Sequence, residues 1–589
     1  MDASSALQRL FGFSEFRPGQ PEAVAAALDD RDALVVMPTG AGKSLCYQLP
    51  ALMRDDLTIV VSPLVALMHD QAWAIHRIAP GTVTIVNAQR SAAANAQAME
   101  RVRAGEVRLL YVAPERFGSP AFARALAATR VGLFVVDEAH CVSQWGHDFR
   151  PDYFTLADAA ERVGARATLA LTATATPRVA VDIAARLRLR DPVRVTTGFD
   201  RPNLTFAVVP CRGGTDKERR LVAALSGENA LPAIVYAGTR NTCEELAGVL
   251  DSALDEGVVA YHAGMDRGTR TAVQERFMSG EASVIVATNA FGMGIDKSDV
   301  RTVCHATVPG SLEGYYQEAG RAGRDGRPAR CLLFAEGRDK GLHVFFIQRS
   351  QLSAEAFERV GERLAWAGCD GRYDVPLSDL YGLAAEKGRG DADTVRAVIG
   401  HLARAGVLAP LPAPPDRAVG QITGGWDRRA PALCISSSRE AERVRWAQYR
   451  AIWEYVEGDR CRRETLLRYF GDPAAAAAEG PCCDVCEPDL VPAPVSLARV
   501  MPTGSVDDLD SAIVEVVVTA RPPVGRTRAV EILRGGRSKV VAQYAYDGLP
   551  GYGCFSHLRS DEVLGRVDEL LHAGRLRSTG GRFPKLHAA

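Results

Sequence analysis

The stretch LVVMPTGAGKS, residues 34–44, joins an apolar run to a glycine-rich turn. Its first part is rich in β-branched residues, which is typical of a strand that a parallel sheet buries on both faces. The turn offers what a phosphate-binding loop needs: small residues whose backbone N–H groups face phosphates, a lysine and a hydroxyl for Mg²⁺. Gly40, Gly42, Lys43 and Ser44 meet these needs, and Thr39 is included in the predicted ATP site.

The match to a phosphate-binding loop has one departure. Met37 stands where the strict pattern has glycine. A glycine-rich turn before a surface helix is therefore the alternative interpretation of this stretch.

A second motif, DEAH at residues 137–140, ends another apolar run. Asp137 would hold Mg²⁺ together with Ser44, and Glu138 would orient or deprotonate the attacking water. An acidic pair at a strand end is common on protein surfaces, but a phosphate-binding loop upstream makes nucleotide hydrolysis the stronger interpretation. His140 completes the motif and is counted with the predicted catalytic residues.

Apolar runs of this kind recur along the chain and then restart. The first set lies at 34–38, 58–63, 108–114, 133–140 and 167–174, and the second at 233–239, 258–264, 283–289 and 301–308. Near-continuous apolar strands that alternate with helical stretches predict an α/β fold with two parallel-sheet lobes. In such sheets ligands bind outside the carboxyl ends of the strands, so a cleft between the lobes is expected to hold the site.

The stretch YYQEAGRAGRDG, residues 315–326, brings arginines from the second lobe. Arg321 and Arg324 lie three residues apart, about one helical turn, so both are expected to reach the same side. An arginine donated across a cleft stabilises transition-state charge and is worth roughly 10³–10⁵ in rate. The alternative is a solvated basic face, which the surrounding glycines disfavour.

The whole chain has 589 residues, a formal net charge of −1, and 47% apolar and 24% charged residues. Its length predicts about three to five domains. The near-neutral charge gives no global argument for nucleic-acid binding, so such contacts must come from local patches. The sequence shows no secretory signal and no apolar run near the roughly 20 residues that span a bilayer, so we expect a cytosolic protein without membrane association.

Beyond about residue 340 the sequence becomes rich in helix formers. Residues 391–408 have apolar positions at helical spacing, and a proline-rich, strand-like stretch follows them. An inserted winged helix and an ordinary helical connector fit this pattern equally well. Four of the 13 cysteines fall between residues 461 and 486, which in a cytosolic chain favours a metal site over disulfides.

Together these motifs resemble those of superfamily 2 helicases, and in detail those of the RecQ family. The matching stretches occur in family order: FGFSEFRPGQ (11–20), MPTGAGKSLCYQLP (37–50), VSPLVALMHDQ (61–71), APERF (113–117), DEAHCVSQWGHDFRPDY (137–153), LTATATP (171–177), FDRPN (199–203), YHAGM (261–265), ATNAFGMGIDKSDVR (287–301) and YYQEAGRAGRDG (315–326). The resemblance covers a little over half the chain. It implies an ATP-dependent 3′→5′ DNA helicase that moves on single-stranded DNA and unwinds duplex or branched DNA in recombination, repair or replication.

The architecture that the resemblance implies is α/β, with two RecA-like lobes, a helical zinc-binding segment and a winged-helix, RQC-like domain. The expected boundaries are 1–205 and 206–340 for the lobes, 341–445 for a helical region with a winged helix as one alternative, 446–490 for the zinc segment, 491–505 for a linker and 506–589 for the last domain. The implied cofactors are ATP, Mg²⁺ and Zn²⁺.

The resemblance also assigns roles to single residues. Phe13 would stack on adenine while Arg17 and Gln20 contact its polar edge, a chemically reasonable adenine site. Gln317 joins Arg321 and Arg324 in the catalytic set. An aromatic-rich loop after the DEAH motif would bind DNA and couple it to ATP hydrolysis, since base stacking is worth roughly 1–3 kcal/mol per base and tolerates any sequence. Its DNA-binding residues would be Gln144, Trp145, His147, Phe149 and Arg150.

The cysteine cluster departs from the family pattern. The common C-x2-C-x2-C spacing would place a cysteine at residue 480, but that residue is glycine and Cys482 lies directly beside Cys483. We expect Zn²⁺ held by Cys461, Cys482, Cys483 and Cys486. A three-cysteine site completed by histidine or water is the alternative.

The C-terminal stretch 527–579 resembles the winged-helix RQC domain. A local basic cluster begins it, at Arg526, Arg528, Arg534, Arg537 and Lys539. The expected partners are single-stranded and duplex DNA and a single-stranded-DNA-binding protein, in a bacterial-like cytoplasm at the nucleoid. Alternatives to a helicase are a DNA-dependent ATPase that remodels or anneals DNA without unwinding, a non-catalytic DNA-binding scaffold and an RNA helicase.

Overall fold

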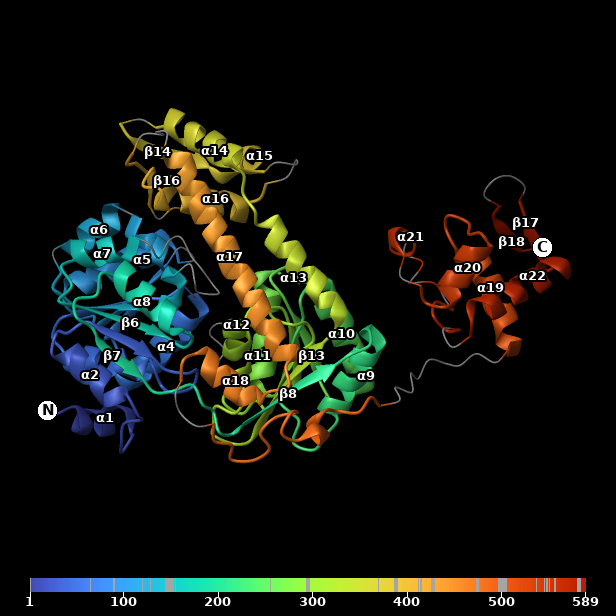
Figure 1. The fold of residues 1–589 in the computed structure, drawn as a ribbon, viewed down its shortest axis with the longest axis horizontal. Helices are drawn as coiled ribbons and strands as arrows, with labels where there is room; N and C mark the ends of the chain where they lie inside the picture. The colour runs from blue at the N-terminus through green and yellow to red at the C-terminus, as the bar shows by residue number, and fades with distance from the viewer. Residues whose placement is uncertain are drawn as a thin grey trace. The chain divides into compact units, whose positions relative to one another are not determined.

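The computed structural model describes residues 2–588 except 64, 88–89, 119, 128, 144–152, 154, 255, 293–296, 369, 386–389, 412, 414–415, 425–428, 473–475, 496–505, 537, 545, 547–548, 550, 556–557 and 580–583. The chain forms two compact units, Met1–Val495 and Ser496–Ala589 (Figure 1). The first unit contains two sheets of parallel strands, which confirms the predicted pair of α/β lobes.

Lobe 1 is built on a seven-stranded parallel sheet with the order β3-β4-β2-β5-β6-β1-β7. Its strands are β1 (Ala33–Val36), β2 (Leu57–Val61), β3 (Val83–Val86), β4 (Leu109–Val112), β5 (Val131–Val136), β6 (Ala167–Thr172) and β7 (Val193–Thr196). Its helices are α1 (Ala3–Phe11), α2 (Gln20–Leu28), α3 (Leu45–Met53), α4 (Val65–Ile78), α5 (Ala92–Arg103), η1 (Pro114–Gly118), α6 (Pro120–Ala127), η2 (Ala139–Val142), α7 (Leu156–Arg162) and α8 (Pro177–Arg186). The central strands are buried along their whole length, as helices on both faces of a parallel sheet require.

Lobe 2 is built on a six-stranded parallel sheet with the order β10-β11-β9-β12-β13-β8. Its strands are β8 (Leu204–Pro210), β9 (Ala233–Tyr236), β10 (Val258–Tyr261), β11 (Val284–Ala287), β12 (Thr302–His305) and β13 (Ala329–Ala335). Its helices are α9 (Gly214–Leu225), α10 (Arg240–Ala253), α11 (Arg267–Ser279) and α12 (Leu312–Ala319).

Two long helices, α13 (Gly337–Arg349) and α17 (Ala430–Glu457), rise from lobe 2 and carry a further folded segment at their far end (Figure 1). This segment, residues 354–422, is called the inserted unit below. It consists of α14 (Ala354–Trp366), β14 (Arg372–Pro376), η4 (Leu377–Leu380), α15 (Tyr381–Ala384), α16 (Ala392–Arg404), β15 (Leu408–Leu411) and β16 (Arg417–Ile422). Its strands form an antiparallel sheet with the order β14-β16-β15, and its helices and strands share a hydrophobic core of their own. It therefore contains a sheet as well as helices.

The cysteine segment follows α17 and packs on lobe 2. It contains α18 (Arg462–Tyr469) and η5 (Pro488–Leu490). An isolated bridge pairs Phe206 of β8 with Cys483, and the Phe206 N–H donates to the Cys482 carbonyl at 3.2 Å.

The second unit has its own core and is described by itself. It contains α19 (Val506–Thr519), α20 (Arg526–Leu533), α21 (Lys539–Gln543), α22 (Ser560–His572) and an antiparallel pair, β17 (Leu576–Ser578) with β18 (Leu586–Ala588). The expected apolar stripe of α22 is present: Val563, Val567 and Leu570 are buried in that core. Among the helices that the structure describes in either unit, none combines the length and the apolar character needed to cross a membrane.

Candidate active site

The glycine-rich turn lies between the end of β1 and the start of α3, the position that a phosphate-binding loop requires. Gly40 and Gly42 have φ of +86° and +83°, a backbone region that residues with a Cβ rarely adopt. Lys43 folds back over the loop, and its Nζ donates to the Met37 carbonyl at 3.0 Å. Burial lowers the pKa of Lys43, while Glu138 and Asp137 act in the opposite direction. The lysine is thus held in the loop within reach of two acidic groups.

The acidic pair follows β5, whose neighbour in the sheet is β2. The Asp137 N–H donates to the Val61 carbonyl at 2.9 Å, which fixes the carboxylate at the end of the strand. Burial and the adjacent Glu138 raise the pKa of Asp137 to about 7, against the effect of Lys43. Two carboxylates crowded in a buried site fit a divalent cation, because the cation relieves their repulsion. The acidic pair therefore fits the expected Mg²⁺ site, and the part of Ser44 in it stays a prediction.

His140 connects the acidic pair to a neighbouring strand. Its Nδ1 lies 3.4 Å from Glu138 Oε2 and 3.0 Å from the hydroxyl of Thr172, at the end of β6. The imidazole is fully buried. His140 can therefore link Glu138 to Thr172, which begins the TAT motif, rather than contact solvent.

The residues expected at adenine lie beside the loop. Arg17 Nη1 donates to the Gly40 carbonyl at 2.7 Å, and Gln20 Nε2 donates to the Gly42 carbonyl at 3.1 Å. The Phe13 ring is 53% exposed and so is accessible for stacking. Both polar side chains thus brace the phosphate-binding loop, and their contact with adenine stays a prediction.

Both second-lobe arginines lie near Tyr236 at the end of β9, where burial raises the pKa of its hydroxyl and each arginine acts to lower it, but their other contacts differ. Helix α12 ends at Ala319, so both lie in the turn that follows rather than on a helix face. A Cβ on Gly40 would lie 3.4 Å from Arg324 Cγ, and Arg324 is near enough to Lys43 to lower the pKa of its amine. Arg321 is buried, and its Nη2 would lie 3.1 Å from a Cβ on Gly292. Arg324 is therefore the arginine that meets the phosphate-binding loop.

Sequence reasoning missed Arg201, which connects the two lobes at this site. Its Nη1 donates to the carbonyls of Thr39 at 2.9 Å and Gly320 at 3.3 Å. Its Nη2 donates to the carbonyls of Ala322 at 3.1 Å and Gly323 at 3.0 Å. One side chain thus holds the phosphate-binding loop and the arginine-bearing turn together. The only signal in the sequence was its place in the FDRPN stretch.

A cavity of about 650 Å³ lies at the carboxyl ends of β9 and β12 in lobe 2, and helices α13 and α17 form its outer wall. Gln317 and Arg321 line it, as does Phe346, whose ring is 53% exposed. Among the described residues, His305 Nδ1 and Gln448 Nε2 are buried atoms of this wall that make no hydrogen bond. Unpartnered polar atoms beside an exposed ring fit a ligand with both polar and aromatic parts.

The predicted DNA loop lies almost wholly outside the described residues. This applies to Gln144, Trp145, His147, Phe149 and Arg150, so their role stays a prediction. The residue before the loop, Ser143, is buried, and its hydroxyl donates to Asp182 Oδ2 of α8 at 2.7 Å. Ser143 is thus anchored to α8.

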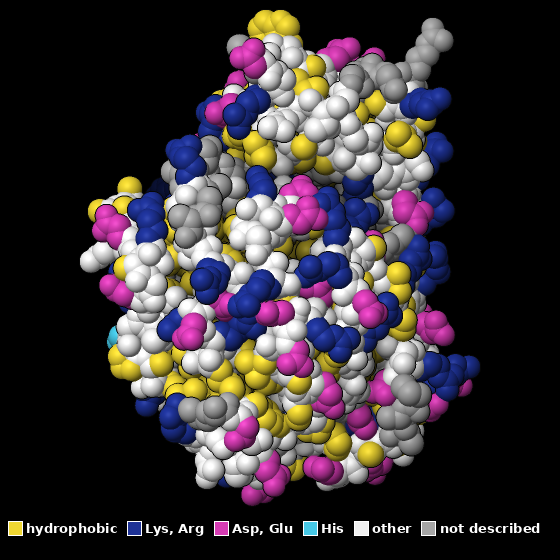
Figure 2. Space-filling model, turned by 90° about the vertical axis from the view of Figure 1, so that its left-hand side faces the viewer, with side chains coloured by type: hydrophobic (Ala, Val, Ile, Leu, Met, Phe, Trp, Pro, Cys, Tyr) yellow, Lys and Arg dark blue, Asp and Glu magenta, His cyan; other side chains and the backbone are white. Residues whose placement is uncertain are grey.

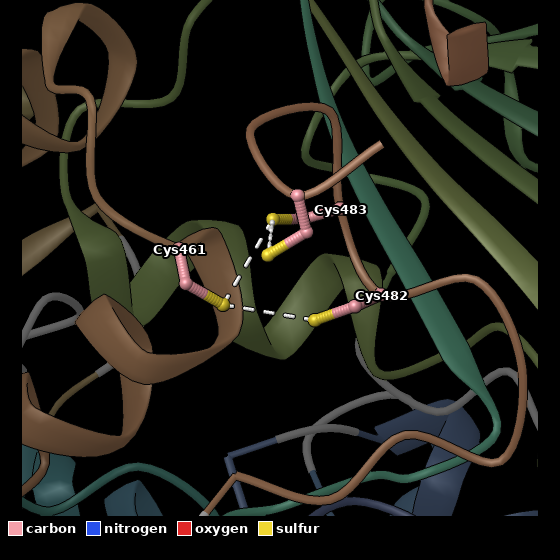
Figure 3. Close-up of side chains that lie close together, drawn as sticks. Cys461, Cys482 and Cys483 are labelled. Carbon is pink, nitrogen blue, oxygen red and sulfur yellow. Dashed lines mark hydrogen bonds between the residues drawn. The ribbon is translucent and has the colours of Figure 1, made fainter. Parts of the chain in front are cut away.

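The four predicted cysteine ligands come together (Figure 3). Their sulfurs all lie within 4.8 Å of one another, with Cys461 Sγ 3.6 Å from Cys482 Sγ and Cys483 Sγ 3.5 Å from Cys486 Sγ. Four sulfurs bound tetrahedrally to zinc at about 2.3 Å lie about 3.8 Å apart. The cluster therefore fits Zn²⁺, and the adjacent pair Cys482 and Cys483 both face it.

Four family models match the chain in order. A DEAD/DEAH box helicase model matches residues 17–183, and a helicase conserved C-terminal domain model matches residues 216–326. A RecQ zinc-binding model matches residues 426–487, and an RQC domain model matches residues 507–589.

Curated relatives match more than half of the chain. The chain is 30% identical over 592 residues to an ATP-dependent DNA helicase RecQ of Bacillus subtilis, and this covers 99% of the chain and 82% of the relative. It is 40% identical to an ATP-dependent DNA helicase RecQ of Haemophilus influenzae over 61% of the chain and 58% of that protein. It is 43% identical to ATP-dependent DNA helicase Q5 of Rattus norvegicus over 59% of the chain and 37% of that protein.

Proposed function

The chain belongs to the RecQ family of ATP-dependent DNA helicases, and on that premise we propose that it moves 3′→5′ along single-stranded DNA and separates duplex or branched DNA. The observation that carries the proposal is the contact between the lobes, where Arg201 of the connecting segment and Arg324 of lobe 2 meet the phosphate-binding loop. A site divided in this way can turn ATP hydrolysis into opening and closing of the lobes. The direction is carried over from the resemblance.

ATP and Mg²⁺ are the cofactors of the site, and Mg²⁺ supplies charge neutralisation at the phosphates. Gly40 and Gly42 let the loop backbone face the phosphates, and Lys43 turns from its loop carbonyls toward the terminal phosphate. Asp137 holds the cation, Glu138 orients the water, and Arg324 meets the charge that develops as the terminal phosphate leaves. Arg201 holds the turn that carries Arg324 beside the phosphate-binding loop.

We place the tracking strand along two features. The loop 144–150 would stack bases, and the lobe 2 cavity would take a nucleotide, with its phosphate near Arg445 and Gln448 and its base near Phe346. Both features would contact the DNA backbone or the flat face of a base, so neither requires a particular DNA sequence. The second unit would hold the duplex.

The cellular role is proposed from the resemblance and from the substrate. Separation of DNA strands serves recombination, repair and replication, in a cytoplasm and at the nucleoid. A single-stranded-DNA-binding protein is the expected partner, because it occupies the strands that unwinding releases.

A strand-displacement panel tests the helicase. Forked, 3′-tailed and 5′-tailed duplexes are compared with matched ATPase assays. We expect displacement of forked and 3′-tailed substrates and none of the 5′-tailed one. Preference for the 5′ tail would reverse the proposed direction.

The second candidate is a DNA-dependent ATPase that remodels or anneals DNA, which the inserted unit on α13 and α17 favours. DNA-stimulated hydrolysis without displacement on any substrate would support it over the helicase. Trp145→Ala tests the coupling loop in the same assays: DNA stimulation should be lost while nucleotide binding persists. Unchanged stimulation would remove the loop from the mechanism.

A further inference from the structure

The inserted unit lies in a part of the chain that the matched family models leave between them, residues 327–425. Helices α13 and α17 carry this unit and are called its stem; they are fixed to lobe 2. His343 of α13 donates from Nε2 to the Val308 carbonyl at 2.8 Å and accepts from Trp453 Nε1 of α17 at 3.2 Å. Tyr455 of α17 donates to the hydroxyl of Tyr315 at 3.4 Å. The buried contacts make α13 and α17 part of lobe 2.

The far end of the stem meets lobe 1. Strand β15 lies against η1, and a cavity of about 720 Å³ is lined by α7 and Arg186 on one side and by Arg404, β15 and Gln421 on the other. Arg178 of α8 also pairs with Glu440 of α17 at 3.4 Å, although both groups are partly exposed and contribute little to stability. Figure 2 faces lobe 1 with the inserted unit above it and shows Lys and Arg side chains gathered in the band below that unit.

One carboxylate of lobe 1, that of Asp182, lies between Ser143 and Arg186. Asp182 Oδ2 accepts from Ser143 at 2.7 Å, and Asp182 Oδ1 accepts from Arg186 Nε at 3.2 Å. Arg404, at the end of α16, lines the same cavity as Arg186. Burial and Arg186 lower the pKa of Arg404 to about 9 against the effect of Asp182, so Arg404 is charged at neutral pH and near enough to Asp182 to be influenced by it.

Arg404 is itself held by the stem. Its Nη1 donates to the hydroxyl of Ser437 in α17 at 3.0 Å. Polar side chains therefore follow one another from Ser437 of α17, which moves with lobe 2, to Arg404, across the cavity that Arg404 shares with Arg186, and from Arg186 through Asp182 to Ser143.

We propose that the inserted unit is a winged helix used as a strap between the lobes, and that Arg404 and Asp182 are positioning residues that pass lobe movement to the DNA loop. The order helix, strand, two helices and two strands supports the winged-helix assignment. Helix α16 packs between α14 and α17. The helix that a DNA-binding winged helix would place in a groove therefore contacts protein here. When hydrolysis moves lobe 2, the strap shifts Asp182 and so moves the anchor of the loop. This inference rests on the proposed function.

Arg404→Ala tests the strap, with Arg396→Ala as the matched control. Arg396 is on the same helix, but its guanidinium pairs with Asp393 inside the inserted unit at 3.1 Å. ATP hydrolysis is measured in the full chain without DNA and across a titration of oligothymidine. We expect Arg404→Ala to lower the ratio of stimulated to basal turnover by about five- to tenfold, the lower end of usual coupling between sites. The basal turnover of Arg396→Ala and its melting temperature should both match the wild-type values.

Two further measurements keep the test decisive. Asp182→Asn should give the same loss of stimulation, and the double variant should add little to either single change because both act on one path. Arg404→Lys should restore part of the stimulation, which a purely structural defect would not predict. Equal stimulation in Arg404→Ala and Arg396→Ala, or normal stimulation in Asp182→Asn, would overturn the strap. Absence of DNA stimulation in the wild type would instead overturn the proposed function.

Discussion

Arg201 lies in the segment between the two lobes, and its guanidinium donates to the carbonyl of Thr39 in the phosphate-binding loop at 2.9 Å. The same guanidinium donates to three carbonyls of the turn that carries Arg324. Such a fork of donors can satisfy several carbonyls at once, which a lysine amine cannot do with the same geometry. The joint between the lobes thus depends on one side chain of the segment that connects them.

Arg201→Ala should lower ATP turnover by about 10²-fold, because displacement of a catalytic group by about 1 Å has effects of that size. Arg201→Lys should recover only a minor part. Turnover numbers are measured with saturating DNA, and nucleotide affinity is measured with a fluorescent analogue. Turnover within twofold of the wild type in Arg201→Ala would show that the joint forms without it.

Arg324→Ala should lose about 10³–10⁵ in the rate of hydrolysis, the usual contribution of an arginine at the leaving phosphate. Arg321→Ala is its matched control, since Arg321 lies toward the lobe 2 cavity and not toward Gly40. We expect Arg321→Ala to weaken DNA affinity more than hydrolysis at saturating DNA. Single-turnover hydrolysis and DNA binding are measured for both. Equal loss of hydrolysis in the two variants would contradict the separation of the arginines.

Lys43→Ala should abolish ATP hydrolysis, with a loss of at least about 10²–10³-fold, because a preorganised positive charge at the phosphates disappears. DNA binding should persist, since the hydrogen bonds of Lys43 within the described part of the chain go to the Met37 and Pro38 carbonyls beside its own loop. Phosphate release and fluorescence anisotropy with an oligonucleotide check both statements. Retained turnover would contradict the assigned ATP site.

Arg463→Ala should destabilise the segment around Arg201, which joins the lobes, as well as the cysteine segment. Arg463 is 1% exposed, and its Nη1 donates to Asp200 Oδ1 at 2.5 Å and to the Arg201 carbonyl at 2.8 Å. Loss of one partner of such a buried pair costs about 3–5 kcal/mol. Chemical denaturation with zinc quantified in the same sample measures the loss. Arg468→Ala is the control, because Arg468 pairs with Glu464 on the surface of the same helix.

The ATP site could be predicted from the sequence because its parts are local. A strand, a glycine-rich turn and a lysine lie within residues 34–44, and their geometry follows from the chain itself. Arg201 could not be assigned this way, since its partners at Thr39 and Gly320 are distant in sequence and its role exists only once the lobes meet.

Two other differences have similar causes. The spacing of Arg321 and Arg324 predicted that one helical turn brings both to the same side, but α12 ends at Ala319 and the two residues lie in the turn that follows. The adjacent pair Cys482 and Cys483 was unfavourable by spacing, yet pairing of this segment with Phe206 brings both sulfurs to the cluster. The roles of Trp145 and its neighbours stay predictions.

The pairing of the cysteine segment with β8 has a consequence for the behaviour of the protein in solution. Strand β8 is the last in the lobe 2 sheet, and an uncovered edge strand is a template for pairing with other chains. Residues 481–484 cover that edge: Thr205 Oγ1 donates to the Pro481 carbonyl at 2.8 Å, and the Asp484 N–H donates to the Phe206 carbonyl at 3.2 Å. We therefore expect zinc bound by the cysteine segment to limit aggregation, and its removal should be detected as self-association by light scattering.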